Sequence, residues 1–162
     1  MRVDVYIDFL CPFCRMFEEQ NGEALDELTA RDLITLIYHP LGFLDRLSTT
    51  RYSTRAAAAS GCASDGGRFR EYLYTLYENQ PPEGTSGLSD EQLVRLGLRS
   101  GLDENFGICV VNGVYVDWAE YITALAAARG VNGTPSVYVD GVGVPASARA
   151  ITEATIAVLD RP

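Results

Sequence analysis

Two cysteines that stand where a strand runs into a helix constrain this chain more than any other feature. The segment Val3–Leu10 is rich in β-forming residues, and the apolar residues that follow Cys14 recur at roughly helical spacing. Pro12 suits the first position of a helix, because no amide hydrogen is needed there and its φ is already near the helical value. The pattern therefore predicts that Cys11 caps the helix and that Cys14 lies about one turn inside it.

This placement favours redox chemistry. The partial positive charge and unpaired amide hydrogens of a helix start stabilise a thiolate, which is the nucleophile of disulfide exchange. We expect Cys11 to be the exposed attacking sulfur and Cys14 to resolve the mixed disulfide. The alternatives are half of a zinc site or a chance pair. Zinc would need two more ligands, and Cys62, Cys109 and His39 show no paired metal-ligand spacing, so no metal is expected.

Composition narrows the class of protein. The 162 residues are long enough for a sizeable core, and 47% hydrophobic and 22% charged residues are ordinary globular values. The formal net charge of −9 argues against nucleic acids and anionic membrane surfaces as partners. No apolar run reaches the length of a membrane-spanning helix, and no signal peptide is apparent.

The order of elements predicts an α/β fold with a helical insertion. A second strand over 33–38 would complete a β-α-β unit with parallel strands and a right-handed crossover. Helical patterns then fill the region from 50 to 129, in which 79–84 is a predicted surface connection and Ser89–Gln92 a predicted capping box. Strand patterns return at 133–144, and a final helix follows. We therefore expect residues 1–49 and 130–162 to form one domain and residues 50–129 the insertion.

His39, the single histidine, falls in a loop after the second predicted strand. A Cys–His nucleophile pair is one interpretation of it. A structural residue with satisfied hydrogen bonds is the commoner outcome for a histidine in this position. The sequence leaves its role open.

The two halves of the chain together resemble the DsbA-like branch of the thioredoxin superfamily. The resemblance is carried by Cys11-Pro12-Phe13-Cys14 after a strand, by Gly133-Thr134-Pro135 before a β-hairpin, and by the helices between them. It covers essentially the whole chain and is greatest for the actinobacterial DsbA-type proteins. It implies a thioredoxin-like fold with a helical domain inserted between the β-α-β and β-β-α halves.

The resemblance also implies roles for particular residues. Cys11 would be the nucleophile and Cys14 the resolving cysteine. Substrate would be bound by Pro12, Phe13, Thr134 and Pro135, with a cis peptide bond before Pro135. An extra cysteine pair in the insertion of the actinobacterial proteins implies a structural disulfide between Cys62 and Cys109, the alternative being two buried thiols.

Proton transfer is the point at which this chain departs from the family pattern. Thioredoxin relatives often keep a buried carboxylate six positions before the first cysteine, where this chain has Val5. Asp8 lies nearer the motif and is a candidate for the proton relay. The alternative is a residue at the end of the strand that is bound to local backbone.

The predicted function is that of a thiol–disulfide oxidase acting on cysteine-containing polypeptides outside the cytoplasm, without any cofactor beyond its own redox disulfide. The resemblance implies a membrane partner that reoxidises it, and we expect a monomer. The alternatives are a reductase or isomerase of the same fold, a glutathione-dependent isomerase of small molecules, and a redox-inert binding module. The expected location is periplasm-like or in the cell envelope, with any leader or anchor outside this chain; the cytoplasm is the alternative.

Overall fold

The chain folds into two compact units whose segments alternate along the sequence. The sheet unit comprises residues 1–7, 12–39 and the chain from Gly133 onward, whereas the helical unit comprises residues 8–11 and 40–132. This structure is a computed structural model and describes residues 1–159. It confirms the predicted class, an α/β fold in which a run of helices separates the two parts of the sheet.

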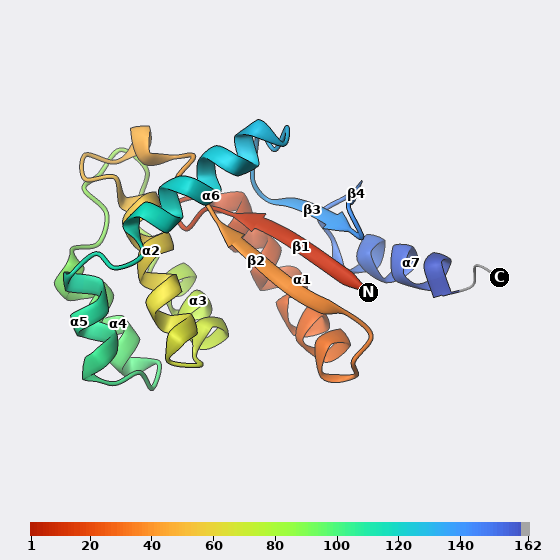
Figure 1. Cartoon of the computed structure of the whole chain (residues 1–162), viewed down its shortest axis with the longest axis horizontal. Helices are drawn as coiled ribbons and strands as arrows, with labels where there is room; N and C mark the ends of the chain where they lie inside the picture. Colours follow the sequence, from red (N-terminus) through yellow and green to blue (C-terminus); the bar gives the residue numbers. More distant parts are fainter. Residues whose placement is uncertain (160–162) are drawn as a thin grey trace. The chain divides into compact units, whose positions relative to one another are not determined.

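The sheet unit is built on four strands in the order β2-β1-β3-β4 (Figure 1). β3 pairs antiparallel with both of its neighbours, and Val137 faces Val5 of β1 and Val144 of β4. The arrows of β1 and β2 run in the same direction in Figure 1, as expected for strands joined through a helix. The four strands are β1 (Arg2–Ile7), β2 (Thr35–Pro40), β3 (Ser136–Val139) and β4 (Val142–Val144).

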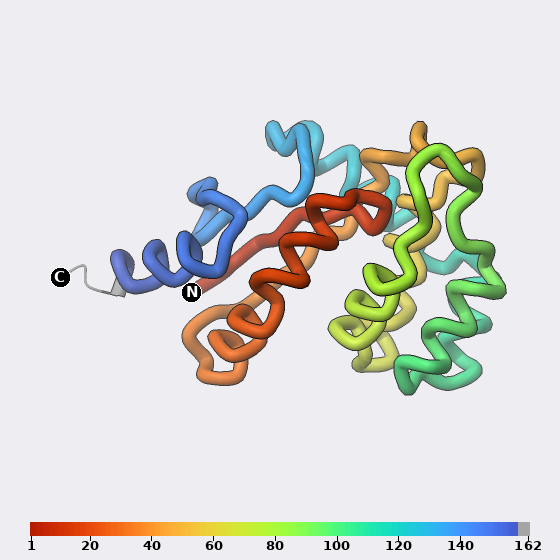
Figure 2. Tube along the Cα trace, turned by 180° about the vertical axis from the view of Figure 1, so that it is seen from behind, coloured from red at the N-terminus to blue at the C-terminus, as the bar shows by residue number. Residues whose placement is uncertain are grey.

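Two helices, α1 (Pro12–Ala30) and α7 (Ala148–Leu159), belong to the same unit. α1 lies behind β1 and β2 in Figure 1 and in front of them in Figure 2, so it covers one face of the sheet. α7 packs against α1, β3 and β4. The Asn21 side chain of α1 accepts a hydrogen bond of 2.8 Å from the amide of Ala148, the first residue of α7.

The predicted hairpin between β3 and β4 is present. Asp140 and Gly141 both have positive φ, 45° and 83°, as a two-residue turn of this hand requires. Glycine has no side chain to oppose that backbone, and the short polar side chain of aspartate tolerates it. The Asp140 carboxylate also accepts a hydrogen bond of 2.9 Å from the amide of Arg2, which ties the turn to the start of β1.

The helical unit holds five α-helices and one short 3-10 helix, and α2 packs against each of the other four α-helices. Ala57 and Ala58 of α2 are buried against Ala119 of α6, and these small side chains let the helices approach closely. The elements are η1 (Asp45–Leu47), α2 (Tyr52–Asp65), α3 (Phe69–Glu78), α4 (Asp90–Arg99), α5 (Glu104–Val111) and α6 (Val116–Ala128).

Local sequence signals account for several helix ends. Ser89 and Gln92 form the predicted capping box, in which each side chain bonds the backbone amide of the other residue. Within the unit, the buried Tyr72 hydroxyl of α3 donates to the carbonyl of Leu93 in α4, and the ring of Tyr72 packs edge-to-face with that of Phe106 in α5.

In the part of the chain that the structure describes, no helix has the length and apolar character to span a bilayer.

The boundaries of the units differ from the predicted ones. The sequence pattern placed residues 1–49 with the sheet, but residues 8–11 and 40–49 pack with the helical unit, which extends to residue 132. The reason is hydrogen bonding over long separations: Tyr77 and Ser53, both in the helical unit, bind the carbonyl oxygen and the carboxylate of Asp8. The turn that carries Cys11 is therefore held by the helices.

Candidate active site

The two candidate redox cysteines lie where the sequence predicts. Cys11 immediately precedes α1, Pro12 is the first residue of that helix, and Cys14 is the third. Neither cysteine is joined in a disulfide in this structure. The helix therefore begins between them, and its unpaired amide hydrogens are directed toward the end that carries Cys11.

The expectation that Cys11 is an exposed sulfur is wrong in this structure. The exposed fraction of Cys11 is 4%, and that of Cys14 is 0%. Phe9 and Leu10, which lead into the motif, are also fully buried, so the whole turn packs inward. Periodicity alone did not reveal this burial, because the residues that cover the turn are distant in the sequence.

Asp8 organises this turn through both its backbone and its side chain. Its carbonyl oxygen accepts a hydrogen bond of 3.0 Å from the amide of Cys11, and its Oδ1 accepts one of 2.9 Å from the amide of Leu10. Two further donors reach the carboxylate from the helical unit: Ser53 Oγ to Oδ1 at 2.6 Å and the Leu44 amide to Oδ2 at 2.9 Å. Asp8 is thus bound to local backbone, as expected for a residue at the end of a strand. It is also bound to groups that are distant in the sequence.

The Asp8 carboxyl has an unusual acidity for an aspartate. Burial raises its pKa to about 6, although the hydrogen bonds from Ser53, Leu10 and Leu44 act in the opposite direction. The charge of Cys11 raises this pKa further. Since each negative charge disfavours the other, the protonation states of Asp8 and Cys11 are linked.

The first turn of α1 presents an apolar surface. Phe13 and Met16 are exposed to 68% and 46%, and their spacing of three residues places both side chains on one face of the helix. Phe13 was a predicted substrate-binding residue. Met16 was not among the predicted site residues, and its exposure became visible only in the structure.

Thr134 and Pro135 precede β3, and the peptide bond between them is cis. Pro135 lies at one end of an open groove of about 380 Å³ along the β3–β4 hairpin. Tyr138, Gly143 and Pro145 also line this groove. Because β4 is the last strand of the sheet, the groove lies beside a sheet edge.

His39 is a satisfied structural residue on the sheet. Its Nε2 lies 2.7 Å from Oδ1 of Asp4, and its ring stacks on Tyr6 with the centroids 4.4 Å apart. Arg2 also holds Asp4 through two hydrogen bonds of 2.8 and 2.7 Å. Burial would raise the pKa of Asp4, but the hydrogen bonds from Arg2 and His39 outweigh it and hold that pKa below its usual value.

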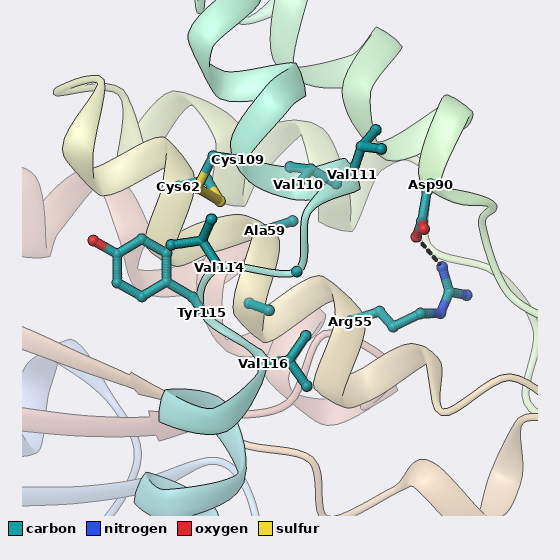
Figure 3. Close-up of a pocket in the computed structure, with 12 residues that line it drawn as sticks. Arg55, Ala59, Cys62, Asp90, Cys109, Val110, Val111, Val114, Tyr115 and Val116 are labelled. Atoms are coloured by element: carbon teal, nitrogen blue, oxygen red, sulfur yellow. Dashed lines mark hydrogen bonds and ion pairs between the residues drawn. A yellow bond between two sulfur atoms is a disulfide. The ribbon is translucent and has the colours of Figure 1, made fainter.

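Cys62 of α2 and Cys109 of α5 form a disulfide, with their Cα atoms 5.9 Å apart. Figure 3 shows this bridge beside a small cavity of about 100 Å³. Val111 and Val114 line the cavity, and the ion pair between Arg55 and Asp90 lies at its edge. Neither Cys11 nor Cys14 is among the lining residues, so this cavity is separate from the candidate redox pair.

The predicted surface connection at residues 79–84 contains an exception. The Gln80 side chain is half-buried and binds backbone carbonyls of the turn before α1. Flanking proline and glycine indicate a loop, but they do not show that one of its side chains is directed inward.

Within residues 1–159, no three histidine, cysteine or acidic side chains gather into a potential metal site.

Comparisons with known proteins agree with this geometry. A family model described as "Thioredoxin" matches residues 1–156. The oxidised DsbA of Mycobacterium tuberculosis is similar with a TM-score of 0.87 at 30% identity, covering 99% of this chain and 83% of that one. The reduced disulfide bond oxidoreductase DsbG of the same organism is similar with a TM-score of 0.86 at 30% identity, covering 99% and 78%.

Among curated proteins, the serine/threonine-protein kinase PknE of Mycobacterium tuberculosis is 29% identical over 147 residues. The match covers 84% of this chain and 26% of the kinase, so the chain spans about a quarter of that relative's length. The family match spans almost the whole chain and includes the cysteine pair at the start of α1. The two structural matches at 30% identity cover 99% of the chain. The chain therefore belongs to the thioredoxin family, in its branch of DsbA-like thiol–disulfide oxidoreductases.

Proposed function

We propose that this chain is a thiol–disulfide oxidase that transfers the disulfide of Cys11 and Cys14 to cysteine-containing polypeptides. The observation that carries the proposal is the position of the pair, with Cys11 immediately before α1 and Cys14 in its first turn. The other two cysteines are already joined to each other, which leaves this pair to change oxidation state. Family membership supports the same chemistry.

The exchange takes two steps. A substrate thiolate attacks Sγ of Cys11 in the oxidised pair, forming a mixed disulfide and releasing Cys14 as a thiolate. A second substrate thiolate then attacks the substrate sulfur of the mixed disulfide and releases Cys11 as a thiolate. The substrate dithiol loses two electrons and two protons; the cysteine pair gains the two electrons, and the two protons pass to the reduced pair and to solvent.

The direction of transfer follows from the helix. The N-terminus of α1 stabilises a negative sulfur at Cys11, which makes Cys11 a good leaving group and favours the reduced pair. A more stable reduced form corresponds to a more oxidising disulfide. The position of Cys11 at the start of α1 therefore favours an oxidase over a reductase of the same fold.

Asp8 serves as the proton relay of the pair in this proposal. Its pKa of about 6 lies near neutrality, where a group can both accept and release a proton. Because the charge of Cys11 raises this pKa, thiolate formation at Cys11 favours proton uptake by Asp8. The negative charge that Cys11 gains when it is released as a thiolate is thereby offset by proton uptake at Asp8, in the same turn.

Substrate binding is assigned to the two chain segments that the family resemblance identified. Exposed Phe13, preceded by Pro12, offers an apolar contact next to the nucleophile. Pro135, which Thr134 precedes, lines the groove along β3 and β4, where an extended polypeptide can lie beside a sheet edge. An unfolded, cysteine-containing chain has the apolar side chains and extended backbone that both surfaces require.

We propose that the protein acts outside the cytoplasm. The Cys62–Cys109 disulfide supports an oxidising compartment, hence an extracytoplasmic location. Each turnover leaves the cysteine pair reduced, so a reoxidising partner is required, and we place it in the membrane. In this proposal the protein acts as a monomer and carries the electrons on the Cys11–Cys14 pair.

Two measurements test the assignment. The reduction potential of Cys11–Cys14, found by equilibration with glutathione buffers, is expected near those of strong oxidants, about −120 mV, rather than near thioredoxin, about −270 mV. In parallel, the oxidised protein should speed the refolding of a reduced, disulfide-containing substrate more than the reduced protein speeds insulin reduction. A strongly negative potential together with fast insulin reduction would show a reductase.

A further inference from the structure

Within the helical unit, Gln80 binds the turn that carries Cys11. It follows α3 directly after Asn79, and its side-chain amide nitrogen donates to two backbone carbonyls, those of Phe9 and Cys11, each at 3.0 Å. The partners are 71 and 69 residues away in the sequence. Since both neighbours are acceptors, only the NH₂ end of the amide fits this position.

The two carbonyls lie at different points of the turn: that of Phe9 lies between β1 and α1, and that of Cys11 is the cap carbonyl, at which α1 begins. Residues 8–11 lie between the end of β1 and the start of α1, and Phe9 and Leu10 are fully buried. A buried carbonyl without a donor costs free energy comparable to a lost hydrogen bond. One half-buried glutamine supplies a donor to the Phe9 carbonyl and an additional donor to the cap carbonyl of Cys11.

Other side chains hold the turn at a different point. Ser53 and Tyr77 bind Asp8, through its carboxylate and its carbonyl oxygen respectively. Gln80 instead reaches the backbone of the cysteine itself. The conformation of Cys11 at the helix cap therefore depends directly on this glutamine.

We propose that Gln80 is a positioning residue for Cys11, holding its backbone where the helix N-terminus stabilises the thiolate. The inference rests on the proposed function of Cys11 as nucleophile. Two physical effects act together. The amide orders the turn, and its partial positive hydrogens offset the partial negative charge of the carbonyl oxygens of Phe9 and Cys11. Without them, a thiolate at Cys11 experiences more of the negative ends of these dipoles, so the pKa of Cys11 rises.

The test replaces the donor but keeps the length of the side chain. Gln80→Met preserves much of the packing and cannot donate. At a pH below the pKa of Cys11, the reaction of the reduced protein with a small aromatic disulfide is expected to slow about three- to tenfold, because a smaller fraction of Cys11 is present as thiolate. The apparent pKa of the Cys11 thiolate, followed by absorbance at 240 nm, is expected to rise by about half a unit to one unit.

The neighbouring amide provides a matched control. Asn79 donates its side-chain nitrogen to the carbonyl of Thr75 in its own helix, at 2.9 Å and in an exposed position. Asn79→Ala is therefore expected to leave both the exchange rate and the thiolate pKa at wild-type values. Equal changes in Asn79→Ala and Gln80→Met, or none in either, would overturn the proposal.

A second variant keeps the proposal testable if Gln80→Met folds poorly. Gln80→Glu retains the shape of the side chain but, when ionised, places negative charge against the two carbonyls and near the thiolate. The upward shift of the Cys11 pKa is expected to exceed that in Gln80→Met. A smaller shift would contradict the positioning role.

The two measurements on Cys11 do not depend on whether the proposed function is correct. Thiolate titration and exchange with a small disulfide report on Cys11 whether or not the wild-type protein oxidises polypeptides. A wild-type protein that fails in oxidative refolding but shows the Gln80 effect would refute the oxidase assignment alone. A wild-type oxidase that is insensitive to Gln80→Met would refute the positioning role alone.

Discussion

At the scale of single residues, Asp8 holds the turn before α1 and is the proton relay that we propose. Its carboxylate accepts hydrogen bonds from Leu10, Leu44 and Ser53, yet burial still raises its pKa to about 6. Such a group is ionised at neutral pH only at a cost to the folded state. The same property that suits it to proton transfer therefore makes it a source of pH-dependent stability.

Asp8→Asn tests this cost. An unfolded aspartate has a pKa near 3.9, so between pH 4 and pH 6 the folded wild-type protein binds more protons than the unfolded chain. The stabilisation from protonated Asp8 is complete below about pH 4 and is lost as the pH rises through about 6. Asparagine does not ionise, so the free energy of unfolding of the variant relative to wild type is expected to rise by about 2–3 kcal/mol from pH 4 to pH 7.5.

Urea unfolding at the two pH values measures the change. Glu23→Gln, at an exposed position on α1, serves as the control and is expected to show little such change. A difference between Asp8→Asn and wild type that stays constant with pH would contradict the raised pKa.

The two cysteines of the motif are expected to behave differently when each is replaced. Reduced Cys14→Ser keeps the nucleophile but cannot resolve the intermediate, so a mixed disulfide between Cys11 and a disulfide-containing peptide should accumulate. Cys11→Ser should form much less adduct at position 14, because Cys14 lies inside the first turn of α1 and not at its cap, where the unpaired amide hydrogens stabilise a thiolate. Mass spectrometry of quenched reactions distinguishes the two, and equal amounts of adduct in both variants would contradict the assigned roles.

At the scale of elements, His39 joins β2 to β1. Its hydrogen bond to Asp4 and its stacking on Tyr6 both cross between these strands. The lone histidine thus has a structural explanation that needs no reaction. A group used in this way contributes to the stability of the sheet and leaves the cysteine chemistry to the turn before α1.

His39→Phe keeps an aromatic ring on Tyr6 and removes the hydrogen bond to Asp4. We expect the free energy of unfolding to fall by about 1–2 kcal/mol, because Asp4 keeps Arg2 but loses a charge-assisted partner. The exchange rate of Cys11 is expected to remain at the wild-type value. Denaturant unfolding and a small-disulfide assay measure the two quantities, and a large loss of exchange in a stable variant would place His39 in the chemistry.

At the scale of the whole molecule, the helical unit contains a covalent link between α2 and α5. Cys62 and Cys109 are separated by 47 residues in the sequence. In the chain-entropy description, closing a loop of this length restricts the unfolded chain by about 4 kcal/mol. The link therefore stabilises the unit that also holds the turn of Cys11.

Replacing both of these cysteines by alanine is expected to lower the free energy of unfolding by about 2–4 kcal/mol, the lower figure allowing for residual structure in the unfolded chain. Thermal and urea unfolding under non-reducing conditions measure the loss. Exchange at Cys11 should persist in the folded variant, because the bridge does not line the candidate redox site. Unchanged stability would contradict a stabilising role, and lost exchange in folded protein would give the bridge a functional one.

Local signals made much of the fold predictable. Pro12 marks the start of α1, Ser89 and Gln92 cap α4, and Asp140-Gly141 turns the chain between β3 and β4. Each of these depends on residues within about four positions of one another, so the sequence displays them directly. The family resemblance then placed these elements in one topology, with the cysteine motif at the start of α1.

The sequence by itself determined the strands and helices, the fold class and the position of the cysteine pair. Only the tertiary structure decided that residues 8–11 belong with the helices, that Cys11 is almost completely buried, and that Gln80 binds its backbone. The physical reason is separation along the chain. These features depend on hydrogen bonds and burial between residues that are 36 to 71 positions apart. Contacts over such separations leave no periodic pattern in the sequence. Side chains from distant segments therefore set the environment of Cys11, whereas neighbouring residues set its place at the start of the helix.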